Sequence, residues 1–446
     1  MVSAGLALSL WSGEVATAFN GMLVLDGPAL FFKFLFVVSA GLVILSSADY
    51  VRRFQRFQGE YYALILLSAT GMMLMAATRE LLSIYVSLEL TSISLYVLAG
   101  FLKDEKSSEA GLKYLLLGAI ASAVLLYGMA LVFGITGTTS LAAIAERISA
   151  LSLSGLAGTP ALLMGVILIV AGLGFKIASV PFQMWVPDVY EGAPTPVTAY
   201  LSVASKAAGF AVLMRVFFTA FGPPLEIGAS WGLLLAVLSL LTMTVGNVAA
   251  IAQTNIKRML GYSSISHAGY LIVGVAAMGL GSAADVWSRS SVLFFLASYT
   301  FANLGAFTAI IAISNKTGSD EISDFSGMAK RAPVLTLGMS LCLLSLLGLP
   351  PTAGLIAKVY IFNAAVHQGL MWLVVAAVIN SVISAFYYMR VVRIMWLGTP
   401  SSEEKVPSSG ALRAALVISC LGVLLLGILP GVFIRLAEAA VKMFAS

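Results

Sequence analysis

Charged residues are scarce in this chain: Asp, Glu, Lys and Arg together make up 10% of its 446 residues, against about a quarter in soluble domains. Hydrophobic residues make up 60%, and the mean hydropathy is +1.00. Apolar runs of roughly 20 residues, long enough to cross a hydrocarbon core of about 30 Å, recur from Ala29 onward. The scarcity of charge excludes a soluble enzyme and predicts an all-α polytopic membrane protein.

Cysteine and histidine are equally rare. Cys342 and Cys420 lie in separate apolar runs without CxxC spacing, and His267 and His367 are far apart. Iron–sulfur, zinc and haem sites are therefore not expected. No GxGxxG or GxxxxGK[ST] motif opens a helix after a strand, so no nucleotide cofactor is expected in this chain either. The net charge of +5 implies no nucleic-acid partner, because cytoplasmic membrane loops carry an excess of Lys and Arg.

About twelve transmembrane helices are predicted from the apolar runs. They cover residues 29–48, 61–78, 81–101, 111–134, 161–182, 195–221, 230–252, 261–280, 289–314, 333–367, 370–397 and 411–435. Residues 1–28 form an outward-facing N-terminal segment, residues 29–60 a leading helix and cytoplasmic loop, and residues 411–446 a C-terminal helix. One set of alternate loops holds more than twice as many Lys and Arg residues as the other, so that set is placed in the cytoplasm and the C-terminus outside.

Two of these spans contain proline close to a lysine. Pro181 follows Lys176 in the fifth, and Pro350 and Pro351 precede Lys358 in the tenth. Proline removes a backbone donor and clashes with the preceding turn, so each helix is predicted to be discontinuous. The two breaks are five spans apart. Because five is an odd number, two successive five-span units cross the membrane in opposite orientations. Residues 61–221 and 230–397 are therefore predicted to be two inverted five-helix repeats, as in secondary transporters.

Ionisable residues deep inside spans are the candidate site. Glu89 is the only carboxylate well inside a span, and Lys176, Lys206 and Lys358 lie deep in three others. Each such charge costs about 2.5 to 3.5 kcal/mol on insertion scales. Burial favours the neutral form of a lysine and a nearby carboxylate favours the charged form, so moving one against the other switches the lysine. An ion pair that only ties helices together is the alternative for each.

Two further residues have open interpretations. His267 either titrates near neutral pH or is a helix-packing histidine. Lys113 lies near the end of its span, where it either joins the buried set or reaches the interface, as Lys33, Arg215 and Arg413 are expected to do. The stretch WVPDVYEGAPTP, with Asp188 and Glu191, is expected to be a polar loop that these acids hold in place.

Four segments carry a family resemblance. They are LGFKIASVPFQMWVPDVYEGAPTPVTAYL, NIKRMLGYSSISHAGY, LLGLPPTAGLIAKVY and SLELTSISLYVL. They resemble the antiporter-like subunits of respiratory complex I, which are related to Mrp-type cation/proton antiporter subunits, and the similarity runs from about Asp26 to Pro430. Among these the chain resembles the N-type, because Lys206 stands where the L- and M-types usually have histidine. Lys358 stands where the M-type usually has glutamate, and the long lateral helix of the L-type is absent.

The resemblance implies a proton-translocating subunit of a bacterial NADH:quinone oxidoreductase in the inner membrane. Glu89 and Lys176 would form the switchable pair, Lys206 the central link and Lys358 the terminal group, and Lys113 matches a family lysine. Partners would be M-, K- and J-type membrane subunits and lipids, with NAD, FMN, iron–sulfur clusters and quinone bound by partner subunits. Gln183 departs from the usual family histidine. The N-type usually has fourteen spans, so either the start lies upstream or two helices are missing.

Three alternatives remain open at the level of the sequence. An Mrp-type Na+/H+ antiporter subunit is argued against by Lys206 and Lys358. A membrane oxidoreductase that binds quinone itself is disfavoured by the lack of redox ligands. A scaffold without a transport role predicts that neutralising the buried charges leaves pumping intact.

Overall fold

The computed structural model describes residues 15–53, 56–151, 159–222, 225–281, 285–400 and 402–443. Within them, eleven helices are long and apolar enough to span a membrane. Two shorter apolar helices, α15 (Pro333–Leu347) and α16 (Ala353–His367), cover the stretch predicted as the tenth span. The first half of the expected outward segment, residues 1–14, lies outside the described residues.

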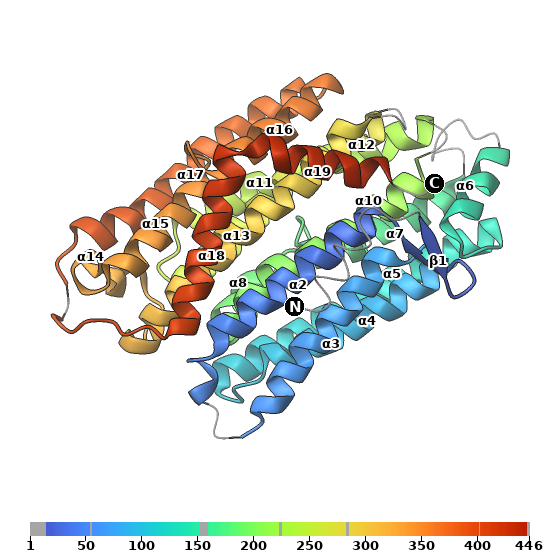
Figure 1. Ribbon diagram of the computed structural model, residues 1–446. Helices are drawn as coiled ribbons and strands as arrows, with labels where there is room; N and C mark the ends of the chain where they lie inside the picture. Colours follow the sequence, from blue (N-terminus) through green and yellow to red (C-terminus); the bar gives the residue numbers. More distant parts are fainter. Residues whose placement is uncertain are drawn as a thin grey trace.

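The helices lie side by side along the long axis of the molecule (Figure 1). A two-stranded ribbon, β1 (Ala16–Ala18) and β2 (Leu23–Leu25), precedes them. The helices are α2 (Gly27–Ser47), α3 (Gln58–Ala77), α4 (Leu81–Ala99), α5 (Glu105–Thr136), α6 (Leu141–Ala150), α7 (Pro160–Ile177), α8 (Trp185–Gly192), α9 (Thr195–Tyr200), α10 (Lys206–Thr219), α11 (Leu225–Ile251), α12 (Ile256–Leu280), α13 (Val286–Thr317), α14 (Met328–Arg331), α15 (Pro333–Leu347), α16 (Ala353–His367), α17 (Met371–Leu397), α18 (Gly410–Ile428) and α19 (Pro430–Lys442). Short helical turns cover Val51–Arg53, Leu201–Ser205 and Ile322–Phe325.

Two local features occur in both halves of the chain. Helices α5 and α13 each have 32 residues, begin at an aspartate cap and end at a glycine in the left-handed conformation, Gly137 and Gly318. After each helix, one residue pairs with the residue before α4 or α12, through the isolated bridges Glu80↔Ser140 and Asn255↔Glu321. Group α3–α5 with α7 lies to one side of α2 in Figure 1, and α11–α17 to the other. The opposite orientation of the two groups stays a prediction.

Both predicted helix breaks are present. Helix α7 ends at Ile177, and the chain turns through a cis Val180–Pro181 bond before α8. Helix α15 ends at Leu347, and a cis Pro350–Pro351 bond precedes α16. The freed backbone groups find partners inside the protein, as they must at membrane depth: the Trp185 indole donates to the Phe175 carbonyl at 3.0 Å, and the Lys358 ammonium donates to the Leu347 carbonyl at 2.7 Å.

Three expectations from the sequence are wrong. The stretch expected as a polar loop after the first break contains helix α8, since Trp185, Val186, Val189 and Tyr190 give it a buried face. The expected single C-terminal helix is two helices, because Pro430 lacks a backbone donor and starts α19 instead of continuing α18. Arg215 does not reach the membrane–water interface. Its side chain is buried and forms a bidentate ion pair with Asp26, with N–O distances of 3.0 and 2.8 Å.

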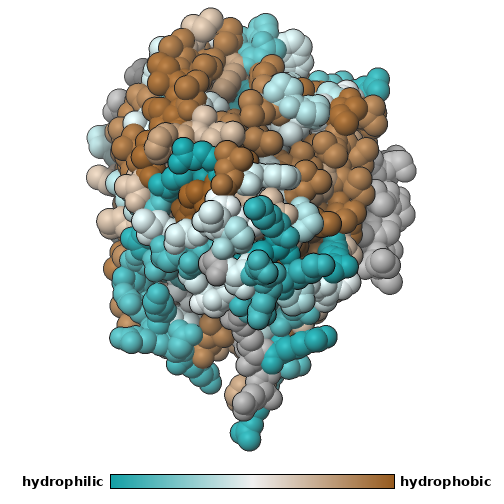
Figure 2. All heavy atoms as spheres, turned by 90° about the vertical axis from the view of Figure 1, so that its left-hand side faces the viewer, coloured by the Kyte–Doolittle hydropathy of each residue, from teal (hydrophilic) through white to brown (hydrophobic). Residues whose placement is uncertain are grey.

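Burial differs strongly between the helices. The segments α9–α10, α12 and α13 are almost completely enclosed by protein, whereas α5, α17 and α18 expose long apolar faces. Figure 2 shows the end of the molecule that carries the loop before α18: hydrophilic atoms gather over its middle and lower part, and hydrophobic atoms cover much of the rest. The buried central helices carry two of the predicted site residues, Lys206 and His267.

Candidate functional site: a series of buried ionisable groups

The first half holds Glu89 and Lys176 on facing helices. Glu89 lies on α4, is partly exposed at the surface of the chain, and accepts a hydrogen bond from Ser122 of α5. Lys176, in the last turn of α7, is buried, and its Nζ donates to the Ser92 hydroxyl at 3.0 Å. The two predicted partners, both within the described residues, make no ion pair. Ser92, Ser122 and Lys176 instead line one cavity of about 10 Å³, which is about the room that one water needs.

Lys206 lies between the two breaks in the sequence. It is the first residue of α10 and directly follows a π-helical turn, Leu201–Ser205, a feature often found at functional sites. The side chain is buried, and its Nζ donates to the Ser264 carbonyl at 2.6 Å and to the Ser264 hydroxyl. Ser202 and Ser205, which flank Lys206 in the sequence, do not contact its ammonium group within the described residues.

The second half brings His267 and Lys358 together. Lys358 of α16 is buried and donates to the Leu347 carbonyl and to the Ser381 hydroxyl, at 2.7 and 2.8 Å. Its ammonium also lies 5.1 Å above the Tyr270 ring, a cation–π distance. His267 is buried, and its Nε2 lies 3.2 Å from the Tyr388 hydroxyl. Both line a second cavity of about 10 Å³, which has room for about one water.

Lys113 stands apart from this buried series. Its side chain is 42% exposed and pairs with Glu109 and with Asp188, each at 2.7 Å. Arg258 contacts the same Asp188 at 2.7 Å and Glu191 at 3.1 Å. Lys113 therefore belongs to an ion-pair network, here called the α8 network, which joins the ends of α5, α8 and α12. Gln183, at the family histidine position, lies between α7 and α8, and its side-chain carbonyl has no partner among the described residues.

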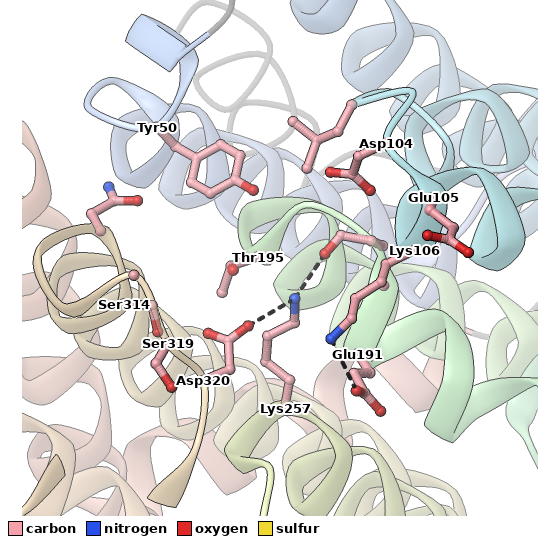
Figure 3. Close-up of a pocket in the computed structure, with 15 residues that line it drawn as sticks. Tyr50, Asp104, Glu105, Lys106, Glu191, Thr195, Lys257, Ser314, Ser319 and Asp320 are labelled. Carbon is pink, nitrogen blue, oxygen red and sulfur yellow. Dashed lines mark hydrogen bonds and ion pairs between the residues drawn. The ribbon is translucent and has the colours of Figure 1, made fainter. Parts of the chain in front are cut away.

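Two hollows open beside the α8 network. One, of about 200 Å³, is lined by the network itself; the other, of about 320 Å³, shares Lys106, Glu191 and Gly192 with it. Figure 3 shows Lys257 reaching into the larger hollow, where its Nζ lies 3.0 Å from the Ala193 carbonyl and 3.4 Å from Asp320. Lys106 and Lys257, which line the hollows, belong to the basic loops predicted to be cytoplasmic. The hollows therefore lie at the end of the molecule that is predicted to face the cytoplasm.

Sequence reasoning missed several polar residues of the core. Asn303 donates to Ser202 at 2.6 Å and to Tyr299 at 3.0 Å. Asn247 and Asn380, 3.2 Å apart, join the Tyr270 and Tyr387 hydroxyls. Neutral side chains of these types also occur widely on soluble surfaces, so only their position within apolar runs distinguishes them in the sequence.

A family model for the membrane domain of "NADH:quinone oxidoreductase/Mrp antiporter" proteins matches residues 78–384. This range contains every candidate site residue. Two curated relatives are subunit N of NADH-quinone oxidoreductase. The one from Dehalococcoides mccartyi is 52% identical over 97% of this chain and 89% of its own length. The one from Trichlorobacter lovleyi is 47% identical over 99% of this chain and 89% of its own length.

Solved structures give the same assignment at the level of the fold. A chain of respiratory complex I from Thermus thermophilus is 35% identical, with a TM-score of 0.81 over 98% of this chain and 92% of that one. A chain of the Mrp complex from Dietzia shows a TM-score of 0.85 over 99% of this chain and 90% of that one, at 20% identity, and therefore speaks for the fold alone.

Proposed function

The chain belongs to the NADH:quinone oxidoreductase/Mrp antiporter family, and from this premise we propose that it translocates protons as the N-type, antiporter-like subunit of a bacterial NADH:quinone oxidoreductase. Electron transfer in partner subunits would drive this movement, and the chain would carry no redox centre of its own. In the described residues no group of three or more His, Cys, Asp or Glu side chains is placed to hold a metal ion.

One observation supports this proposal above the others: three buried lysines have only neutral partners. Lys176, Lys206 and Lys358 donate to serine hydroxyls or backbone carbonyls, and no described carboxylate lies within ion-pair distance of them. A buried charge without a counter-ion is expensive to hold. Each lysine can therefore gain or lose a proton in response to a small change nearby, as a proton relay requires.

The proposed relay assigns a role to each residue. Glu89 and Lys176 form the input pair, Lys206 links the halves, and His267 and Lys358 form the terminal group. Lys113, which the family resemblance adds to the relay, lies in the partly exposed α8 network and is given the least weight. Because Glu89 is partly exposed in an otherwise apolar stretch of α4, a partner subunit, and not lipid, is expected to cover it.

The proposal extends to the assembly. M-, K- and J-type membrane subunits would be the neighbours, in a bacterial inner membrane with lipids around them and the C-terminus on the outer face. NAD, FMN, iron–sulfur clusters and quinone would be bound by other subunits. Copurification with flavin and iron–sulfur subunits supports this, whereas a stable homo-oligomer with full Na+/H+ exchange would assign the chain to the Mrp type.

Lys206→Ala tests the transport role itself. The substitution removes the central ammonium from a helix that is otherwise fully packed, so the complex is expected to assemble while redox-driven pumping falls by about tenfold or more. Pumping is measured as acidification driven by NADH oxidation in sealed membrane vesicles, with subunit content as the control for assembly. Normal pumping in an assembled complex would favour the scaffold instead.

A further inference from the structure

Helix α8 connects the surface ion pairs to the central lysine. It is eight residues long and packs against α5 and α12. Asp188 and Glu191 lie on its outer side, in the α8 network, and Tyr190 lies on its buried side with no exposed surface. The helix therefore has one side fixed by charge and another that faces the core.

The buried side of α8 approaches Lys206 through one intermediate. The Tyr190 hydroxyl lies 3.3 Å from the Ser264 hydroxyl oxygen, and that oxygen also accepts from the Lys206 ammonium. A serine oxygen has two lone pairs and one proton, so it serves both neighbours at once. A helical serine can also turn its hydroxyl back toward its own backbone, as Ser291 does to the Ser288 carbonyl at 2.8 Å.

The outer side of α8 is tied to the helix that carries Ser264. Arg258 and Ser264 both lie on α12, and they contact Asp188 and Tyr190 of α8 respectively. Just past the end of α8, Lys257 also donates to the Ala193 carbonyl at 3.0 Å. Contacts at both ends of this short interface fix the height and rotation of α8, and hence the place of the Tyr190 hydroxyl.

We propose that Tyr190 is a positioning residue for Lys206: its hydroxyl holds the Ser264 side chain toward the lysine, and the ion pairs of Asp188 hold Tyr190 in place. The inference rests on the proposed function of Lys206. It adds that Tyr190 keeps the Ser264 hydroxyl in place as the acceptor for the lysine. Other titratable side chains around this point are Tyr114 of α5 and Tyr299 of α13, which face Tyr190, and His267 of α12, which faces Lys206.

The test is Tyr190→Phe in the assembled complex, with the pH profile of pumping as the readout. Without the tyrosine hydroxyl, Tyr299 is the one tyrosine left beside the Ser264 hydroxyl. The serine is then held less firmly toward Lys206, and the ammonium form of the lysine is stabilised less. The alkaline limb of the profile is then expected to move toward lower pH by about one unit, equivalent to one net hydrogen bond. Ser264→Ala is expected to give the same shift, and the double variant no more than either.

Tyr200→Phe is the matched control. Tyr200 is also fully buried, and its hydroxyl also meets a serine, Ser68 at 3.4 Å, but not a lysine. Its profile is expected to match that of the unmodified complex. Asp188→Asn is expected to shift the profile in the same direction as Tyr190→Phe, by less, because Glu191 still holds Arg258.

Two results would overturn the inference. One is a Tyr190→Phe profile identical to that of Tyr200→Phe in a complex with normal subunit content. The other is a Tyr190→Phe shift that persists in full on the Ser264→Ala background, since Tyr190 would then act by another route. Failure of the proposed function is a separate result: Lys206→Ala would leave pumping intact.

Discussion

The two halves of the molecule build corresponding cavities but line them with different side chains. In the first half, α4, α5 and α7 enclose a cavity with Ser92 and Lys176; in the second, α12, α13 and α15 enclose one with His267 and Leu346. Ser92 and His267 each stand eleven residues after the first residue of their helix, and Lys176 and Leu346 each precede the last residue of theirs. The second lysine, Lys358, comes from beyond the break.

The acid is the sharper difference between the halves. Glu89 stands eight residues after the start of α4, and the same count along α12 reaches Ser264. The predicted spans of the second half contain no aspartate or glutamate, so the first half has a carboxyl group in the helix beside its lysine and the second does not. In both halves the buried lysine donates to a serine hydroxyl, Ser92 or Ser381, and only the first half adds a carboxyl group nearby.

Removal of the Glu89 carboxylate or the Lys176 ammonium in the first half should have the largest effect on pumping. Glu89→Ala and Lys176→Ala are each expected to lower redox-driven pumping by about tenfold, and the double variant to be little worse than either, because two groups that act as one unit are not additive. Pumping per electron in assembled complexes measures this. Glu109→Ala, which removes an exposed carboxylate on α5, is the control. Additive losses would show that the two residues work independently, although the structure places them near one cavity.

Giving the second half an acid should have the next largest effect. Ser264→Asp places a carboxylate beside Lys206, at the position that corresponds to Glu89. The new carboxylate favours the charged lysine, and loss of the lysine's proton would leave that buried carboxylate without a counter-ion. Pumping is therefore expected to fall by about fivefold. Ser264→Asn, which has nearly the same size and no charge, is expected to pump better than Ser264→Asp. Equal losses for the two would assign the effect to size and remove the argument from charge.

Apolar length and proline position made the spans and both breaks predictable from the sequence. The same apolar runs made Lys176, Lys206 and Lys358 predictable as site residues. A charged residue deep in a transmembrane span is costly and therefore usually functional. The hydrogen-bond partners of these lysines were not predictable from the sequence. Ser264 meets Lys206 across a sequence separation of 58 residues, and the π-helical turn before Lys206 leaves no compositional trace. The sequence does not predict helix α8, because its short apolar face is interrupted by Pro187 and two acidic residues.

The two breaks should differ in what their lysines do for stability. Lys358 itself satisfies the Leu347 carbonyl that the second break frees, whereas at the first break the Trp185 indole satisfies Phe175. Lys358→Ala leaves this carbonyl with the Ser381 hydroxyl at 3.5 Å as its side-chain donor, so the complex is expected to be destabilised by about 1 kcal/mol. Lys176→Ala should leave the first break intact. Thermal retention of the subunit in the solubilised complex distinguishes them, and equal stability of the two variants would contradict this account.

The smallest effect on pumping is expected for substitution of Lys113. This substitution tests whether the first half has a relay lysine besides the buried Lys176. The side chain is 42% exposed, and Arg258 also holds its partner Asp188, so removing Lys113 leaves that acid paired. Exposed ion pairs contribute little, and Lys113→Gln is expected to lower pumping by less than about twofold. Arg258→Gln should cost more, because Arg258 also holds Glu191. If Lys113→Gln instead abolished pumping as Lys176→Ala does, with subunit content unchanged, Lys113 would carry protons as the family resemblance implies, and its place in the α8 network would be secondary.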